Sequence, residues 1–156
     1  MLTQWFECKV RYDKMCEDGL IKSTNETYLV DAFSFTEAEK RFIAEIEHFT
    51  SGDFVVTDIK RAKLAELFES SDALADRWFR AKVAFITLDE KSGKEKRSVQ
   101  TMMVKAIDLR EAVKNLDNGM SGTMSDYVIA SITETKIMDV FHYMVGEESA
   151  TEQSAE

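Results

Sequence analysis

Histidine, cysteine, serine and carboxylate side chains carry out most enzyme chemistry and bind most protein metals, and this chain offers few of them in suitable arrangements. His48 and His142 are the only histidines, and neither lies near a Ser or Cys in a strand-turn-helix sequence typical of a nucleophile. Cys8 and Cys16 are the only cysteines, so they form neither a zinc site nor a disulfide framework. We therefore expect no catalytic residues, no bound metal, no cofactor and two reduced thiols, with Cys8 buried.

Asp53 and Asp126 are carboxylates in matching positions, because each precedes an apolar segment of similar composition, FVVTDIK or YVIASIT. Such residues can bind a divalent cation, but in this position they more often close a turn. Gly52, Gly119 and Gly122 are scattered and lack the spacing of a phosphate-binding loop. We therefore assign both aspartates to turns and predict that the protein is not an enzyme.

Aromatic and basic residues alternate with apolar ones in two similar segments, WFECKVRY and WFRAKV. A period of two places them on one face of a strand, opposite the apolar side chains. Leu29, Asp31, Met103 and Lys105 are expected beside them on neighbouring strands. This face then carries five basic residues and two acidic ones, although the formal net charge of the chain is -9. The basic residues are Lys9, Arg11, Arg80, Lys82 and Lys105, and the acidic ones are Glu7 and Asp31. The candidate binding face consists of Trp5, Lys9, Arg11, Trp78, Arg80 and Lys82.

Two interpretations of the candidate binding face remain open. Rings between cations on an open sheet bind single-stranded nucleic acid by base stacking and phosphate attraction. Leu29 and Met103, however, are typical of a face buried against the other half of the chain or a second subunit. We favour a non-enzymatic interaction module that self-associates or binds a protein partner, with weak, sequence-tolerant binding of single-stranded nucleic acid as the alternative. A small-molecule carrier with a pocket between two halves is a third possibility, whereas the acidic net charge argues against a duplex-DNA binder.

The two similar segments belong to a longer internal repeat, because shifting the chain by 73 or 74 positions aligns some sixty residues with two one-residue gaps. This pattern predicts a tandem duplication with a first repeat over residues 1–68, a linker over 69–77 and a second repeat over 78–146. The last ten residues, 147–156, are predicted to be a disordered acidic tail. Matched pairs include Trp5 with Trp78, Lys9 with Lys82, Gly19 with Gly93, Asp53 with Asp126, and Phe68 with Phe141.

Each repeat is predicted to contain two antiparallel strands, a helix and a third strand. WFECKVRY and TYLVDAFSF form a hairpin in the first repeat. Ser34 with Glu37, and Asp108 with Glu111, form capping boxes that start the helices. The second helix is expected to end at Asn118-Gly119. The predicted core-facing helix residues are Phe35, Ala38, Phe42, Ile46 and Phe49 in the first repeat, and Leu109, Ala112 and Leu116 in the second.

The fold class is therefore α+β, a duplicated β-β-α-β unit of antiparallel hairpins with one helix per repeat packed on the sheet. Two points stay open. Residues 62–68 and 135–141 fit either a short helix or a strand, and we favour a bent or bulged continuation of the preceding strand. The two repeats either share one sheet or form two packed halves.

The runs WFRAKVAFITLDEKSGKEKRSVQTMMVKA and GTMSDYVIASITETKIMDVF resemble a family of domains of unknown function, number 4494. The resemblance covers the chain from about Trp5 to Phe141. It implies an origin in Bacteroides-type bacteria or their phages and prophages, and it brings no activity and no site residues with it. The amino-terminal sequence, MLTQWFECKVRY, has no signal-peptide pattern and no apolar run has the length of a membrane span, so we expect a cytoplasmic protein without a membrane partner.

Overall fold

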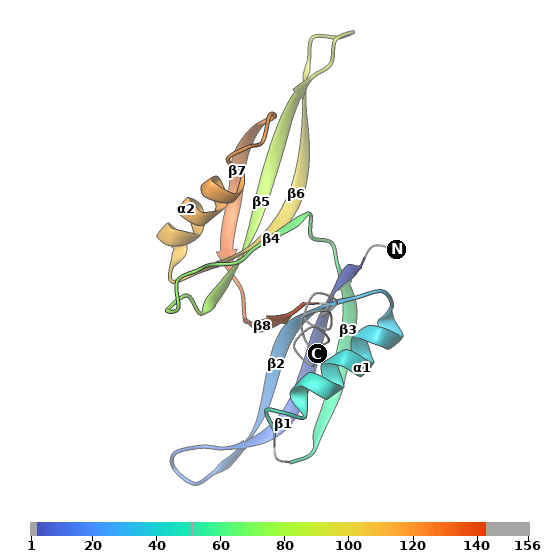
Figure 1. Ribbon diagram of the computed structural model, residues 1–156, viewed down its shortest axis with the longest axis vertical. Coiled ribbons are helices and arrows are strands. Elements are labelled where there is room, and N and C mark those ends of the chain that lie inside the picture. The colour runs from blue at the N-terminus through green and yellow to red at the C-terminus, as the bar shows by residue number, and fades with distance from the viewer. Residues whose placement is uncertain (1–2, 51, 143–156) are drawn as a thin grey trace, which may run out of the picture. The chain divides into compact units, whose positions relative to one another are not determined.

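The computed structural model describes residues 3–50 and 52–142, so the predicted tail at 147–156 lies outside the described residues. The fold is α+β, with two helices and eight strands in two sheets (Figure 1). In chain order the elements are β1 (Gln4–Met15), β2 (Ile21–Ala32), α1 (Phe35–Ile46), β3 (Phe54–Ala62), β4 (Glu66–Phe68), β5 (Arg77–Leu88), β6 (Glu95–Ala106), α2 (Leu109–Gly119), β7 (Asp126–Glu134) and β8 (Ile137–Phe141).

The chain divides into two compact units, each with a four-stranded sheet. The first unit comprises residues up to Ala62 together with those from Asp139 onward, and the second comprises Lys63–Met138. The strand order is β3-β1-β2-β8 in the first sheet and β4-β6-β5-β7 in the second. The alternative of one shared sheet is therefore wrong, and the unit boundaries do not coincide with the predicted ranges 1–68 and 78–146.

The two segments left open by the sequence are strands, but they do not continue the strands before them. β3 ends at Ala62, and β4 pairs in parallel with β6 of the second sheet. β8 is hydrogen-bonded to β2 of the first sheet, although it follows β7 of the second. The favoured bent continuation is therefore wrong, because in each case the chain leaves one sheet and adds an edge strand to the other.

Long hairpins form the centre of both sheets, as predicted. β1 and β2 pair from Gln4 with Ala32 to Met15 with Ile21, and β5 and β6 pair in the same way. Gly19 and Gly93 lie in the two turns with φ of 81° and 69°. This left-handed conformation is costly for residues with a side chain, so glycine is required at both turns.

A β-bulge interrupts the outer strand of each sheet at a matching place. The pairing of β3 with β1 shifts between Lys9 and Val10, and that of β7 with β5 shifts between Lys82 and Val83. A bulge twists an edge strand and disturbs its hydrogen-bond ladder, which limits edge-to-edge aggregation.

Both helices begin at the predicted caps. The backbone N–H of Glu37 donates to Ser34 Oγ at 3.1 Å, and that of Glu111 donates to Asp108 Oδ1 at 2.9 Å. The Glu111 carboxylate accepts a hydrogen bond in return from the backbone N–H of Ile107, the residue before the Asp108 cap. The Glu37 carboxylate accepts in the same way from Phe33, the residue before the Ser34 cap. The second helix ends at Gly119, as expected.

The core of each unit lies between the helix and the facing side of the hairpin. Phe6, Cys8 and Val10 of β1 are fully buried against Phe42 and Ile46 of α1. Phe79, Ala81 and Val83 occupy the matching side of β5. The first predicted helix stripe is buried in its middle and exposed at both ends, where Phe35 and Phe49 are 48% and 63% exposed. In the second stripe only the first residue, Leu109, is exposed, at 52%, whereas Ala112 and Leu116 are buried.

Candidate functional site

The candidate binding face is divided between the two sheets. Trp5, Lys9 and Arg11 follow one another on the side of β1 away from α1, because the intervening residues face the core. Trp78, Arg80 and Lys82 occupy the equivalent side of β5 in the second unit. The structure thus brings each set of three together on its own strand.

Trp5 is half-buried at the start of β1. Its ring meets that of His142 edge-on, with centroids 5.3 Å apart and planes at 80°. Asp31 lies opposite Trp5 on β2. Arg11, further along the strand, is exposed, and Lys9 is half-buried.

Trp78 is only 1% exposed, in contrast to Trp5. Lys105, its partner across the hairpin, places its Nζ 5.6 Å from the ring centroid, within the range of a cation–π interaction. The Trp78 carbonyl accepts hydrogen bonds from the backbone N–H and the hydroxyl of Thr135, at 2.9 and 2.8 Å. A ring buried in this way has no free face on which a nucleic-acid base could stack.

Leu29 and Met103, predicted on the same face, are both fully buried. The exposed charge of the candidate binding face is concentrated at Arg11 and Lys82.

A groove of about 440 Å³ runs between the first turns of α1 and the edge strand β3 in the first unit. Phe35 and Glu39 line it from the helix, and Val56, Asp58 and Ile59 line it from the strand. Among the described residues, neither Glu39 nor Asp58 forms an ion pair. The groove therefore combines apolar walls with the Glu39 carboxylate, whereas the side chain of Asp58, the partner of Lys9 in the pairing of β3 with β1, belongs to the side of the sheet away from α1.

The Phe35 ring at the end of this groove already contacts one cation. The Arg61 guanidinium carbon lies 5.8 Å from its centroid, and the ring packs edge-on against Phe6 at 4.9 Å. The exposed part of Phe35 is thus held in a fixed orientation by the core beneath it.

Tyr12 and Tyr28 share one carboxylate oxygen on the core-facing side of the first hairpin. Their hydroxyls donate to Glu26 Oε1 at 2.7 and 3.2 Å. Burial, assisted by the hydrogen bond to Glu26, raises the pKa of Tyr12 to about 12. Burial and the charge of Glu26 also raise the pKa of Tyr28 above its usual value. Both phenols are therefore neutral structural groups at physiological pH.

The cysteines, the histidines and the two matched aspartates show no arrangement typical of a catalytic site in the described part of the chain. Cys8 and Cys16 are free thiols, as expected, and burial raises the pKa of Cys8 to about 12, so its nucleophilic thiolate is strongly disfavoured. Asp53, Asp126, His48 and His142 are exposed. Across residues 3–50 and 52–142, no three His, Cys, Asp or Glu side chains gather closely enough to hold a metal ion.

A helix can cross a bilayer only if it is long and apolar. None within the described part of the chain has the length and apolar character needed to cross a bilayer.

The fold defines an α+β protein with two four-stranded sheets, each carrying one helix on its hairpin. Comparison with known families matches residues 4–143 to the family described as "Domain of unknown function (DUF4494)". The chain belongs to this family, which confirms the resemblance seen in the sequence. No curated protein and no solved structure matches it.

Proposed function

We propose that the chain is a non-enzymatic interaction module that binds a basic, extended segment of a partner protein in the groove between α1 and β3. The observation that carries this proposal is the position of an available carboxylate, Glu39, beside an exposed aromatic ring, Phe35, along one groove. Lysine and arginine side chains fit such a lining, because their stems cover apolar surface while their charged ends reach the carboxylate.

The edge position of β3 supports an extended partner. β3 is the last strand of its sheet, so its outer backbone groups are available to a further strand within the described structure. Edge strands beside a helix commonly bind peptides through main-chain hydrogen bonds. The bulge near Thr57 interrupts regular pairing there. We therefore expect the segment to pair with Asp58–Ala62 and to place its basic side chains towards α1.

A selection from a random peptide library displayed on phage tests this proposal. The expected peptides contain Lys or Arg alternating with apolar residues. Their binding should be lost in Glu39→Lys, because it replaces the attractive charge with a repulsive one. Glu17→Lys makes the same change in net charge at an exposed position that does not line the groove. It should bind normally.

Two results would overturn the proposal. One is a selection that enriches no basic peptides. The other is enrichment of peptides that bind both variants equally, since attraction to the acidic protein as a whole would then explain them.

Single-stranded nucleic acid is the alternative partner, and the side-by-side positions of Trp5, Lys9 and Arg11 on β1 favour it. Titration with a single-stranded oligonucleotide, followed by tryptophan fluorescence at low and high salt, separates the two. Saturable quenching that salt abolishes would favour nucleic acid, because phosphate contacts release counterions and weaken as salt rises. With Trp78 buried, such quenching should depend on Trp5 and disappear in Trp5→Leu.

We also propose that the two units arose by duplication of one β-β-α-β segment. Three structural features support this proposal beyond the repeated sequence. They are the matching bulges after Lys9 and Lys82, the equivalent caps Ser34 and Asp108, and the left-handed turn glycines Gly19 and Gly93.

A further inference from the structure

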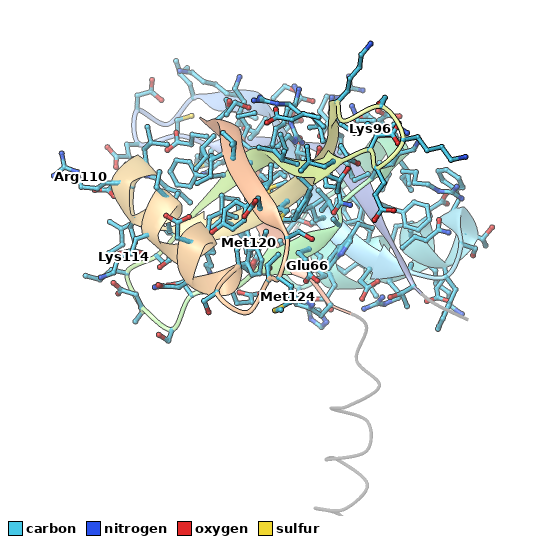
Figure 2. All side chains as sticks on the ribbon, turned by 90° about the horizontal axis from the view of Figure 1, so that it is seen from above. Glu66, Lys96, Arg110, Lys114, Met120 and Met124 are labelled. Carbon is cyan, nitrogen blue, oxygen red and sulfur yellow. The ribbon has the colours of Figure 1, made fainter. Side chains whose placement is uncertain are left out.

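A pocket of about 300 Å³ lies in the second unit, where the end of α2 meets β4 and the hairpin. Its large apolar lining residues are two aromatic residues and two methionines, and its rim carries a carboxylate and an amide. Figure 2 labels Glu66 and Met120, which line this pocket, and Met124 of the adjacent loop. These lining residues are Glu66, Phe68, Phe85, Gln100, Met102 and Met120.

At the equivalent place in the first unit, a larger aromatic side chain, Tyr28, stands where the second unit has Met102. The hairpin registers define the equivalence. Cys8 pairs with Tyr28 in the first sheet where Ala81 pairs with Met102 in the second. Four pairs further on, Tyr12 of the first sheet occupies the position of Phe85.

Three aromatic rings stack in this part of the first unit. The Tyr28 and Phe141 centroids are 5.3 Å apart with planes at 12°, and the Phe141 and Phe49 centroids are 6.3 Å apart with planes at 18°. In the second unit, the edge strand β4 supplies one aromatic ring, Phe68, and the flexible side chain of Met102 stands in the place of Tyr28. An aromatic ring is therefore the kind of group that this position of the fold accommodates.

We propose that this pocket binds a small arylalkylamine, a ligand with one aromatic ring and one ammonium group. The ring would lie against Phe68, Met102 and Met120, since thioethers and ring edges attract aromatic groups. The ammonium would meet the carboxylate of Glu66 at the rim. No Lys or Arg lines the pocket, and the Glu66 side chain takes part in no ion pair among the described residues.

The volume suits a ligand of this size. About 300 Å³ is at the small end of the range for ligand pockets in proteins. Met102 and Met120 are 2% and 5% exposed, so they form the floor, while Glu66 and Gln100 are exposed at the entrance. A single ring with a short charged chain can cover that floor and still reach the rim.

Titration with phenethylamine, followed by the methyl resonances of 13C-methionine, tests the proposal. The methyl signals of Met102 and Met120, assigned with single Met→Leu variants, should shift and saturate in the millimolar range. The signal of Met15, on the first hairpin, should stay fixed. Phenylacetate has the same ring but the opposite charge, and it should bind at least tenfold more weakly than phenethylamine.

Two matched pairs of variants locate the site. Glu66→Gln should weaken phenethylamine binding about tenfold, whereas Glu95→Gln, an equally exposed change elsewhere in the second unit, should not. Gln100→Trp should fill the entrance and abolish binding, whereas Val99→Trp, at the neighbouring position on the opposite face of β6, should leave it intact. Circular dichroism would verify that each variant is folded.

Four results would overturn the proposal. They are the absence of saturable shifts, equal binding of phenylacetate, unchanged binding in Glu66→Gln and unchanged binding in folded Gln100→Trp. This pocket and the groove between α1 and β3 belong to different units, so the peptide selection and the amine titration can fail independently.

Discussion

Two tryptophans in matching sequence positions have different surroundings. Trp5 is half-buried opposite Asp31, whereas Trp78 is 1% exposed beneath Lys105. The period of two correctly predicted the side of the strand on which each ring lies. It could not predict what covers that side, because alternation depends only on neighbouring residues and burial depends on the whole fold. The sequence therefore predicted which residues share this side of each strand, but it did not predict how far solvent reaches them.

Gly119 allows the end of α2 to lie against Phe68. A Cβ at this position would be 2.6 Å from two carbons of the Phe68 ring and 3.0 Å from a third. Alanine stabilises helices by up to about 1 kcal/mol relative to glycine, but overpacking costs about 1–3 kcal/mol. We expect Gly119→Ala to lower the free energy of unfolding by about 1 kcal/mol in urea denaturation.

Gly122→Ala is the control for this prediction. Nothing lies within 4 Å of a Cβ built at Gly122, so its substitution should leave stability nearly unchanged. A Gly119→Ala protein as stable as Gly122→Ala would mean that Phe68 does not pack against α2 as described.

The tyrosines that share Glu26 make stability depend on alkaline pH. The unfolded chain releases phenol protons near the ordinary pKa of 10.0, whereas folded Tyr12 holds its proton to about 12. The stabilising effect is therefore complete below pH 10 and is lost as the pH rises through the folded value. We expect the free energy of unfolding to fall across this window, measured by urea denaturation at a series of pH values.

Glu26→Gln tests the assignment. Removing the carboxylate should make the alkaline fall in stability shallower, but not abolish it, because burial is the larger cause of the raised pKa. Glu17→Gln, on the exposed hairpin turn, should behave as the unmodified protein. An equally steep fall in Glu26→Gln would show that other groups cause it.

At the scale of elements, local signals were sufficient for the hairpins, both helix starts and the end of α2. Alternation, turn glycines and capping residues act through near neighbours, so they can be read from sequence. β4 and β8 were not predictable in this way. β4 contains only three residues, Glu66–Phe68, and it pairs with Met102–Val104 of β6, far along the chain. The grooves could not be predicted either, since they depend on which residues meet between elements.

The caps at Ser34 and Asp108 should contribute similar amounts to stability. Each accepts an N–H that the helix itself cannot satisfy. Ser34→Ala and Asp108→Ala are each expected to lower the free energy of unfolding by about 1 kcal/mol. Asp108→Asn keeps an acceptor and should cost less. Urea denaturation would contradict this assignment if the alanine and asparagine variants at position 108 were equally stable.

At the scale of the whole molecule, the fourth strand of each sheet comes from the other part of the sequence. β8 completes the first sheet beside β2, and β4 completes the second beside β6. The first sequence repeat, residues 1–68, therefore contains a strand that belongs to the second sheet and lacks one that its own sheet requires. Phe141 of β8 supplies the ring between Tyr28 and Phe49, and loss of such a buried ring costs about 3–5 kcal/mol.

Fragments 1–68 and 69–156 should accordingly fold better together than apart. Each fragment alone leaves one core without its edge strand, so neither should show the cooperative unfolding of the intact chain. An equimolar mixture should regain it and the near-ultraviolet circular dichroism of the full protein, because β4 and β8 can then add to the opposite fragment. With Phe141→Ala in fragment 69–156, the mixture should regain much less of the cooperative unfolding and of the near-ultraviolet signal. A fragment 1–68 that unfolds alone as stably as the intact chain would contradict the exchange of strands, since its sheet would then need nothing from the second half.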